Sequence, residues 1–399
     1  ATATELNLID GVTATTAELN IMDGVTSSAA ELNLLDGVTS LGTSNLDGLS
    51  DVKVGGDNFS GSLLIGHETT GTLDEAVNNL GVGQAALDAI TSGAYNTGLG
   101  YGALGNTNSG EGNTAIGGFA GSFITTGSRN IAIGKTAYDW ADTENDNMAI
   151  GYNALGGQIS GGEYNIAIGN YSLDANTSGD KNTAIGYESM TANTTGDKNT
   201  ASGYESLEAN TTGTYNTASG YQALKANTTG NRNAAFGNQA LFANTGSQNS
   251  ALGSHALYVN SSGANNSAMG YYALGLNTTG SYNTASGSYA LNANTTGTRN
   301  VALGYQALLT NIDGNNNTAI GNHSLDAATS GDNNTATGYD ALTGTTTGSD
   351  NIALGYQAGD VITTGSNNVL LGTSADPSAN SASNQIVVGY SAVGHGDNI

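Results

Sequence analysis

A 17-residue repeat occupies most of this chain and restricts its possible folds more than any other feature. Each copy reads N-x-A-φ-G-x-x-A-L, where φ is apolar, and continues into a turn that resembles A-N-T-T-G. We number every copy from its central glycine, which is position 0. This glycine recurs 19 times between Gly83 and Gly389 at a constant interval, except that the interval is one residue longer after Gly151 and one residue shorter after Gly237. A fixed period decides the architecture before any other feature does.

A 17-residue period favours one coil of a β-solenoid. Helical-hairpin repeats need about 33 residues or more, whereas a coil of two short strands and two turns is much shorter. Positions −4, −2 and 0 carry Asn, Ala and Gly, and positions −3, −1 and +1 carry mostly Thr or Ile, Ile or Leu, and Tyr, which is the alternation of a strand. Glycine at position +10, such as Gly213, is expected to supply the positive φ of a tight turn. The sequence therefore predicts an all-β fold, a parallel β-solenoid (β-roll) of about 19 coils.

The asparagine at position −4 is the most regular side chain of the repeat. It is present in 18 of the 19 copies, and the last copy has Gln385 instead. Stacked coils place equivalent residues above one another, so these amides are expected to form a hydrogen-bonded ladder. The predicted structural ladder includes Asn113, Asn182, Asn199, Asn216, Asn233 and Asn300.

The apolar and tyrosine positions predict an association of chains. A coil this small has room inside for Ala, Gly and Ser, so the apolar residues at −1 and the tyrosines at +1 are expected on an outer face. One chain alone would then expose a continuous apolar surface, which monomers rarely do. A homotrimeric fibre would bury it, and the reverse assignment of the two faces would leave the same need. The trimer-face candidates are Tyr187, Tyr204, Tyr221, Ile185 and Leu303.

A second, 13-residue repeat defines a different N-terminal segment. Three copies of the form ELNxxDGVT fall within residues 1–50. Thr2 with Glu5 has the spacing of a capping box, and Gly11 stands where a short helix would end. We expect helix-turn units that form an N-terminal stalk, with solvated loops as the alternative. Residues 51–78 have no evident period and are interpreted as a connector, and residues 79–399 as the solenoid.

Composition excludes several classes of function. The chain has 33 acidic and 8 basic residues and a formal charge of −25, so it would repel nucleic acid. It has no cysteine and no run of 18 apolar residues, which argues against thiolate metal sites and a membrane span. The four histidines, His67, His255, His323 and His395, fall at different phases of the repeat. No clustered carboxylates indicate a polysaccharide-degrading solenoid, so we expect a protein that is not an enzyme.

Two local features depart from the repeat. The runs 142–146 and 313–317 are rich in oxygen ligands, but neither has the glycine and distal glutamate of an EF-hand in register. No cofactor is therefore expected, with calcium as the alternative.

The turn 138–146 contains Tyr138 and Trp140, the only tryptophan, where other copies have A-N-T-T-G. Since aromatic rings anchor interfaces and stack on sugars, these two residues are receptor-contact candidates, and a packed structural corner is the alternative.

Several segments resemble known fibrous proteins. NTAIGYESM at 182–190 and NIALGYQAG at 351–359 resemble the head repeats of trimeric autotransporter adhesins, although those repeats are usually shorter. That resemblance implies a left-handed parallel β-roll trimer. The order of ELNLLDGVT, GSLLIGHETTGTL and then long NTAIGYESM-type arrays is similar to phage tail-fibre proteins, particularly of marine and cyanobacterial phages.

The resemblance to tail fibres implies a location and a role. It implies an extracellular shaft on a virion tail that serves host attachment and receptor binding. Its partners would be further copies of itself, a host surface polysaccharide or protein receptor, and other tail proteins bound through regions outside this chain. The alternative is a trimeric adhesin or extracellular filament subunit on a bacterial cell surface.

Overall fold

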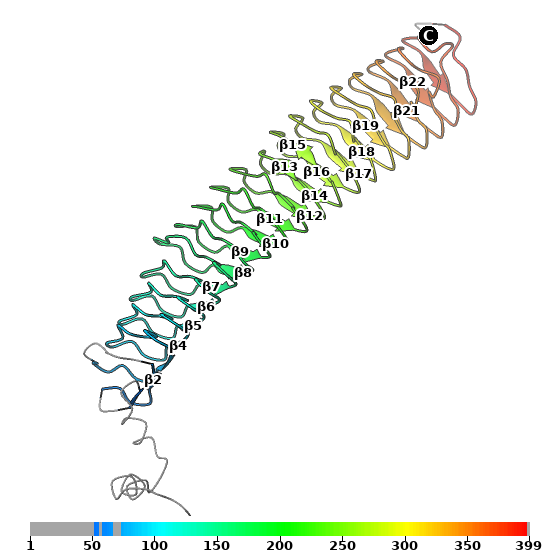
Figure 1. Cartoon of the computed structure of the whole chain (residues 1–399). Coiled ribbons are helices and arrows are strands. Elements are labelled where there is room, and N and C mark those ends of the chain that lie inside the picture. Colours follow the sequence, from blue (N-terminus) through cyan, green and yellow to red (C-terminus); the bar gives the residue numbers. More distant parts are fainter. Residues whose placement is uncertain (1–51, 56–57, 67–72, 397–399) are drawn as a thin grey trace, which may run out of the picture.

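The described part of the chain forms a long, gently curved rod of stacked coils (Figure 1). The structure is a computed structural model that describes residues 52–55, 58–66 and 73–396. These residues form strands and turns and contain no helix. The predicted parallel β-solenoid of about 19 coils with a 17-residue period is confirmed. The predicted helix-turn units of residues 1–50, and His67, lie outside the described residues.

Almost every coil contributes one short strand, at positions −3 to −1. The strands are β1 (Val52–Val54), β2 (Leu63–Ile65), β3 (Leu80–Val82), β4 (Thr97–Leu99), β5 (Thr114–Ile116), β6 (Ile131–Ile133), β7 (Met148–Ile150), β8 (Ile166–Ile168), β9 (Thr183–Ile185), β10 (Thr200–Ser202), β11 (Thr217–Ser219), β12 (Ala234–Phe236), β13 (Ala243–Asn244), β14 (Ser250–Leu252), β15 (Val259–Asn260), β16 (Ser267–Met269), β17 (Thr284–Ser286), β18 (Val301–Leu303), β19 (Thr318–Ile320), β20 (Thr335–Thr337), β21 (Ile352–Leu354), β22 (Val369–Leu371) and β23 (Ile386–Val388).

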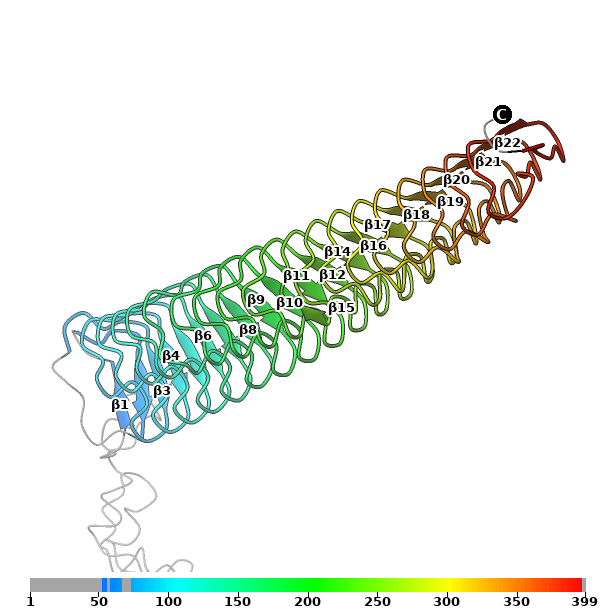
Figure 2. The ribbon, with the colours of Figure 1, turned by 90° about the horizontal axis from the view of Figure 1, so that it is seen from above.

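Neighbouring strands pair in parallel with identical phases opposite each other. Between β9 and β10, for example, Ala184 lies opposite Ala201. The 21-stranded sheet contains one antiparallel member, β1, so twenty parallel strands stack along the rod. At roughly 4.8 Å per strand the stack is about 90 Å long. Figure 2 shows the coils following one another along this single axis.

The prediction of two strands per coil is wrong for most coils. Among the described residues, a second, two-stranded sheet is present only where β13 pairs with β15, next to the shortened interval after Gly237. In every coil from Gly83 to Gly355 the backbone at positions +2 and +4 is left-handed, as at Glu205 (φ 51°) and Leu207 (φ 51°), so this part of the coil is not extended. The short strands β13 and β15 lie beyond it, at positions +6 and +7. The left-handed part still bonds to the next coil, since the Leu207 N–H donates to the Ala223 carbonyl at 3.0 Å.

The central glycine is required both by its conformation and by close packing. From Gly83 to Gly389 its φ lies between 129° and 146°, which residues with a Cβ rarely adopt. A Cβ on Gly203 would lie 2.4 Å from the carbonyl oxygen of Gly220 in the next coil. This explains why position 0 never varies.

The turn glycine has a different role from the predicted one. Gly213, at position +10, does not have a positive φ. A Cβ there would instead lie 2.3 Å from Oδ1 of Asn210 and 2.6 Å from the carbonyl of Gly230. Close approach of two coils and of a buried amide therefore selects glycine at this position.

The interior is filled by small residues and one leucine column. Ala201 at −2, Ser206 at +3 and Leu207 at +4 have no exposed surface, and equivalent residues are buried in the other coils. The small residues expected inside are inside. The leucines join them because the turned half of the coil points position +4 inward.

Two columns of buried asparagine link the coils. At −4, the backbone N–H of Asn199 donates to Oδ1 of Asn182 at 3.0 Å, and its Nδ2 donates to the Gly213 carbonyl at 2.8 Å across the same coil. We call this column the first ladder. The members named from the sequence all lie in it, fully or almost fully buried: Asn113, Asn182, Asn199, Asn216, Asn233 and Asn300.

The second ladder occupies position +7 and was not foreseen as a ladder. Nδ2 of Asn210 donates to Oδ1 of Asn193 at 2.8 Å and to the Gly213 carbonyl at 3.1 Å. It extends from Asn176 to Asn311, and an apolar residue such as Ile124 or a threonine such as Thr107 holds the same position in several coils outside that range. Buried amides that pair with one another meet the requirement that buried polar groups be hydrogen-bonded.

The two ends of the sheet differ. At the N-terminal end β1 pairs with β2 in the antiparallel direction and covers its edge. β2 lies inside the range 51–78 and is in phase with the repeat: Ser62 takes the place of the ladder asparagine and accepts the Asn79 N–H at 2.8 Å. At the C-terminal end β23 pairs with β22 alone among the described strands.

Candidate binding surface

The outer face of the sheet carries the side chains at positions −3 and −1. In β9, Ala184 is fully buried and Ile185 is 41% exposed. Because side chains alternate along a strand, every coil repeats this arrangement. We call the exposed residues at −1 and +1 the apolar stripe. Other exposed members at −1 include Ile116, Leu252, Leu303 and Leu354.

The tyrosines at +1 form the second column of the apolar stripe. The rings of Tyr187, Tyr204 and Tyr221 are stacked, with centroids 5.5 and 5.4 Å apart and planes within 10° of each other. A hydrogen-bonding interaction with Glu205 raises the pKa of Tyr204 to about 12, so its hydroxyl stays neutral. All five trimer-face candidates are thus exposed on one chain, between 36% and 46%. Their burial between three copies stays a prediction.

Basic side chains gather on the column at position −5. Arg129 forms two hydrogen bonds with Asp146, at 2.7 and 2.8 Å, and this pairing lowers the pKa of Asp146. Nζ of Lys198 donates to the hydroxyl of Tyr215 at 2.9 Å. The guanidinium of Arg232 lies 5.6 Å from the centre of the same ring. These cations are engaged along the column and do not form an open basic patch.

Tyr138 is not a surface residue, which corrects its place among the receptor-contact candidates. It occupies position +4, the leucine site, and has no exposed surface. Its hydroxyl accepts Nδ2 of Asn147 at 2.7 Å, and burial raises its pKa far above the usual range. The packed-corner interpretation therefore holds for Tyr138, because the turned half of the coil points position +4 into the core.

Trp140 is half exposed and stacks on Phe123, which was not among the predicted receptor-contact candidates. The centroids of Trp140 and Phe123 are 4.7 Å apart and their planes differ by 9°. Phe123 precedes Trp140 by one repeat period. Because residues one period apart are neighbours in stacked coils, the sequence was enough to identify this pair. A cleft of about 460 Å³ lies beside them. It is lined by Phe123, Thr125, Trp140, Asp142, Thr143, Glu144, Gln158, Ile159 and Ser160.

The acidic run 142–146 does not converge on one point. Asp142 accepts the hydroxyl of Thr125, Glu144 accepts the N–H of Asp142 at 3.0 Å and of Gly161 at 2.9 Å, and Asp146 pairs with Arg129. Within the part of the chain that the structure describes, no three acidic, histidine or cysteine side chains group around a possible metal position. The second run contains Asn315, whose N–H donates to Asp332 at 2.6 Å.

The described histidines are separate. Nδ1 of His255 lies 2.7 Å from Oγ of Ser254, and its ring stacks on Tyr272. Nδ1 of His323 lies 3.5 Å from Asp326. His395 is at the C-terminal end of the rod. They therefore do not form a shared site.

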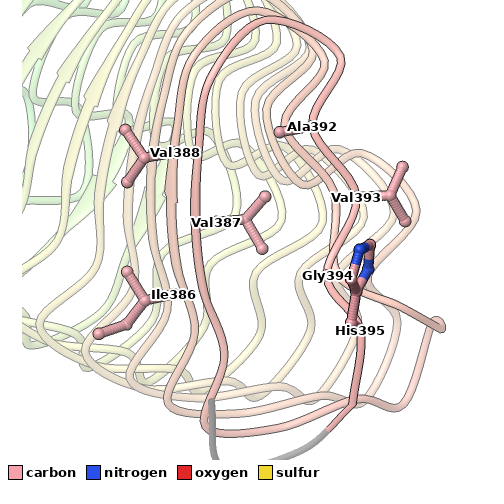
Figure 3. A pocket seen from close by; sticks show the side chains of 7 residues that line it. All are labelled: Ile386, Val387, Val388, Ala392, Val393, Gly394 and His395. Atoms are coloured by element: carbon pink, nitrogen blue, oxygen red, sulfur yellow. The ribbon is translucent and has the colours of Figure 1, made fainter.

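The C-terminal end of the sheet carries an apolar cleft. Figure 3 shows Val387 turned toward the segment 392–395, while Ile386 and Val388 point to the opposite side. The cleft measures about 320 Å³ and is lined by these strand residues and by residues 392–395. Ile386 and Val388 are each 67% exposed, so the last coil presents more apolar surface than the coils before it.

Known families and curated proteins do not identify this chain. No protein-family model matches it, and no curated protein matches it. Among the residues that the structure describes, none forms a helix with the length and apolarity needed to cross a bilayer.

Proposed function

We propose that the chain is a structural, non-catalytic shaft of a virion tail fibre that serves host attachment and receptor binding. The observation that carries the proposal is the single uninterrupted sheet, whose parallel strands run from β2 to β23 along one axis. A stack that is bonded at every coil transmits force along its length and holds a distal part at a fixed distance. The resemblance of the repeats to tail-fibre arrays supports the same role.

The shaft is proposed to be a homotrimer. The apolar stripe runs along the same side of successive coils, and monomers rarely expose connected apolar surface of more than a few hundred Å². Three copies with their stripes turned to a common axis would bury it on every chain, because cyclic assembly leaves no open surface of this kind. Ile185, Leu303 and the tyrosines at +1 would then lie between chains.

The mass in solution tests the trimer. Light scattering coupled to size exclusion is expected to give three times the 39.8 kDa of one chain. Ile185→Asp would bring three carboxylates together near the axis and is expected to shift the mass toward that of the monomer. Thr212→Asp adds the same charge on an exposed turn and should leave the mass unchanged. A wild-type mass of one chain would contradict the proposed trimer.

The location tests the role. Antibodies against the purified chain, followed in the electron microscope with gold particles, are expected to label virion tails from the source culture. The alternative is a trimeric adhesin or filament on a bacterial surface, which the repeat at 351–359 also resembles. Labelling of cells and not of virions would favour that alternative.

A further inference from the structure

Phe123 and Trp140 form an aromatic shelf on the outside of the rod. Their side chains are 44% and 50% exposed although the rings stack on each other. Both stand at position +6, where alanine is the commonest residue in the other coils. Two large exposed aromatics at adjacent rungs are not needed to hold this fold, since the alanine coils have the same path without them.

The next coil offers no aromatic ring to stack on the second face of Trp140. One face lies against Phe123, and position +6 of the following coil is Gly157. A Cβ on Gly157 would lie 2.3 Å from the carbonyl oxygen of Asp174, so that coil has no room for a side chain there. The ring therefore faces the cleft of about 460 Å³ described above.

The rim of this cleft combines carboxylate, hydroxyl and amide groups. Asp142, Thr143, Gln158 and Ser160 line it and are exposed. Glu144 is buried, and its carboxylate accepts backbone N–H groups of its own turn and of Gly161, so it holds the cleft in shape. A flat apolar ring with a few polar groups around it is typical of a site that orients a small ligand.

These groups fit a sugar ring better than other ligands. The polarised C–H bonds on one face of a pyranose are attracted to the negative face of an aromatic ring, while its equatorial hydroxyls can donate to a carboxylate and exchange hydrogen bonds with amides and hydroxyls. Asp142 and Glu144 are both acidic, and the chain carries a formal charge of −25. An anionic polymer would be repelled from this position.

We propose that the shelf of Phe123 and Trp140, with Asp142 and Gln158 on its rim, binds a neutral hexopyranose unit of a polysaccharide. The proposal rests on the proposed function, in which the fibre contacts a host surface, and it names the class of ligand and the position on the shaft. It makes Trp140 and Phe123 binding residues and assigns no chemical reaction to the site.

The only tryptophan of the chain reports on this site directly. The experiment titrates the full chain with glucan, mannan and galactan hexasaccharides and follows tryptophan emission, excited where tyrosine does not absorb. At least one series is expected to shift the emission saturably. Polygalacturonate, the anionic comparison, is expected to give no saturable shift.

Variants separate binding from folding. Phe123→Ala keeps the reporter and is expected to weaken the binding of the responding sugar at least about tenfold, and Gln158→Ala should weaken it less. Phe242→Ala is the matched control, because Phe242 also stacks on an aromatic ring one coil away, Tyr258, with centroids 5.2 Å apart. Its affinity should stay within about twofold of the wild type.

The outcomes distinguish this proposal from the proposed function. If no neutral series shifts the emission, or if polygalacturonate alone does, the sugar site is wrong even when antibodies label virion tails. If Phe123→Ala and Phe242→Ala bind alike, the shelf is not the binding surface. Saturable binding by the shelf together with labelling of cells alone would keep the site and overturn the tail-fibre role.

Discussion

The coils in the middle of the rod and the coils that flank them hold the same corner by different means. From Asn176 to Asn311, position +7 is a buried asparagine that bonds to its counterpart in the next coil. In flanking coils the same position holds Ile90, Ile124 or Ile362, each almost fully buried. Apart from the short strands β13 and β15, neither region forms a strand at this corner in the described residues.

Hydrogen-bonded amides and apolar side chains can therefore both fill this corner. An asparagine there is stable because its amide has partners on both sides, and an isoleucine because it needs none. The C-terminal end of the second ladder lacks one of these partners. Oδ1 of Asn311, the last asparagine of the ladder, is buried without a partner because the next coil has Ala328 at this position. A ladder thus has its weak point at its end.

The strongest destabilisation should come from a feature that both regions share. Gly203→Ala places a Cβ 2.4 Å from a backbone oxygen at a φ of 140°, whereas Gly389→Ala, in the last coil at φ 138°, meets nothing closer than 3.4 Å. Backbone strain costs about 1–3 kcal/mol at either site. The clash adds to it only at Gly203, so Gly203→Ala should destabilise by more than about 4 kcal/mol. Denaturant titration checks this, and equal effects would show that strain alone selects the glycine.

The first ladder is expected to be more sensitive in the flank than in the middle. Asn113→Ala removes the side-chain donor to the Gly127 carbonyl, at 2.8 Å, and the acceptor of the Asn130 N–H. Asn199→Ala leaves only the Asn216 N–H without its acceptor, because the Gly213 carbonyl still accepts Nδ2 of Asn210. An unpaired buried group costs about 1–3 kcal/mol, so we expect losses of about 4 and about 2 kcal/mol in unfolding titrations. The exposed Asn108→Ala is the control, and a larger loss at Asn199 would contradict the comparison.

The end of the second ladder should tolerate substitution better than its middle. Asn210→Ala leaves Oδ1 of Asn193 unpaired, at a cost of about 1–3 kcal/mol. Asn311→Ala leaves Oδ1 of Asn294 unpaired but removes an oxygen that already had no partner. Unfolding titrations should therefore show a smaller loss for Asn311→Ala. Equal losses would mean that the ladder has no weak end.

The smallest effect is expected from the pH dependence of two carboxyl groups in the flanking coils, Asp139 and Asp376. Burial raises the pKa of Asp139 and of Asp376 to about 6, and both have an unpartnered buried oxygen. The folded state then holds a proton more tightly than the unfolded chain, whose Asp pKa is about 3.9. This contribution is present below about pH 4 and is lost as the pH rises through about 6.

The test replaces each carboxyl by an amide. Asp139→Asn and Asp376→Asn should each flatten the fall in stability between about pH 4 and pH 6 and raise stability at neutral pH. Asp313→Asn, on an exposed turn, is the control. A profile that keeps its slope in both variants would show that these two groups do not titrate as described.

One feature of the site could be predicted from the spacing of residues in the repeat, and another could not. The pairing of Phe123 with Trp140 follows from their separation by one period. That Tyr138 is buried while Trp140, two residues later, is exposed does not follow, because the turned half of a coil does not alternate as a strand does. For the same reason, the inward direction of the leucines at +4 could not be predicted from the sequence.

The repeat alone was enough to predict the parallel β-solenoid, its 17-residue period and the asparagine ladder at position −4. A constant period in a stacked chain makes residues of equal phase neighbours, so the chemistry of one copy defines the contacts of all. Which glycine has a positive φ, that most coils have one strand, and that the asparagines at +7 form a second ladder became known from the three-dimensional arrangement. These features depend on how each coil closes and on what the adjacent coil offers, since the space at Gly203 and the partner of Asn311 are set by the neighbouring coil and not by local sequence.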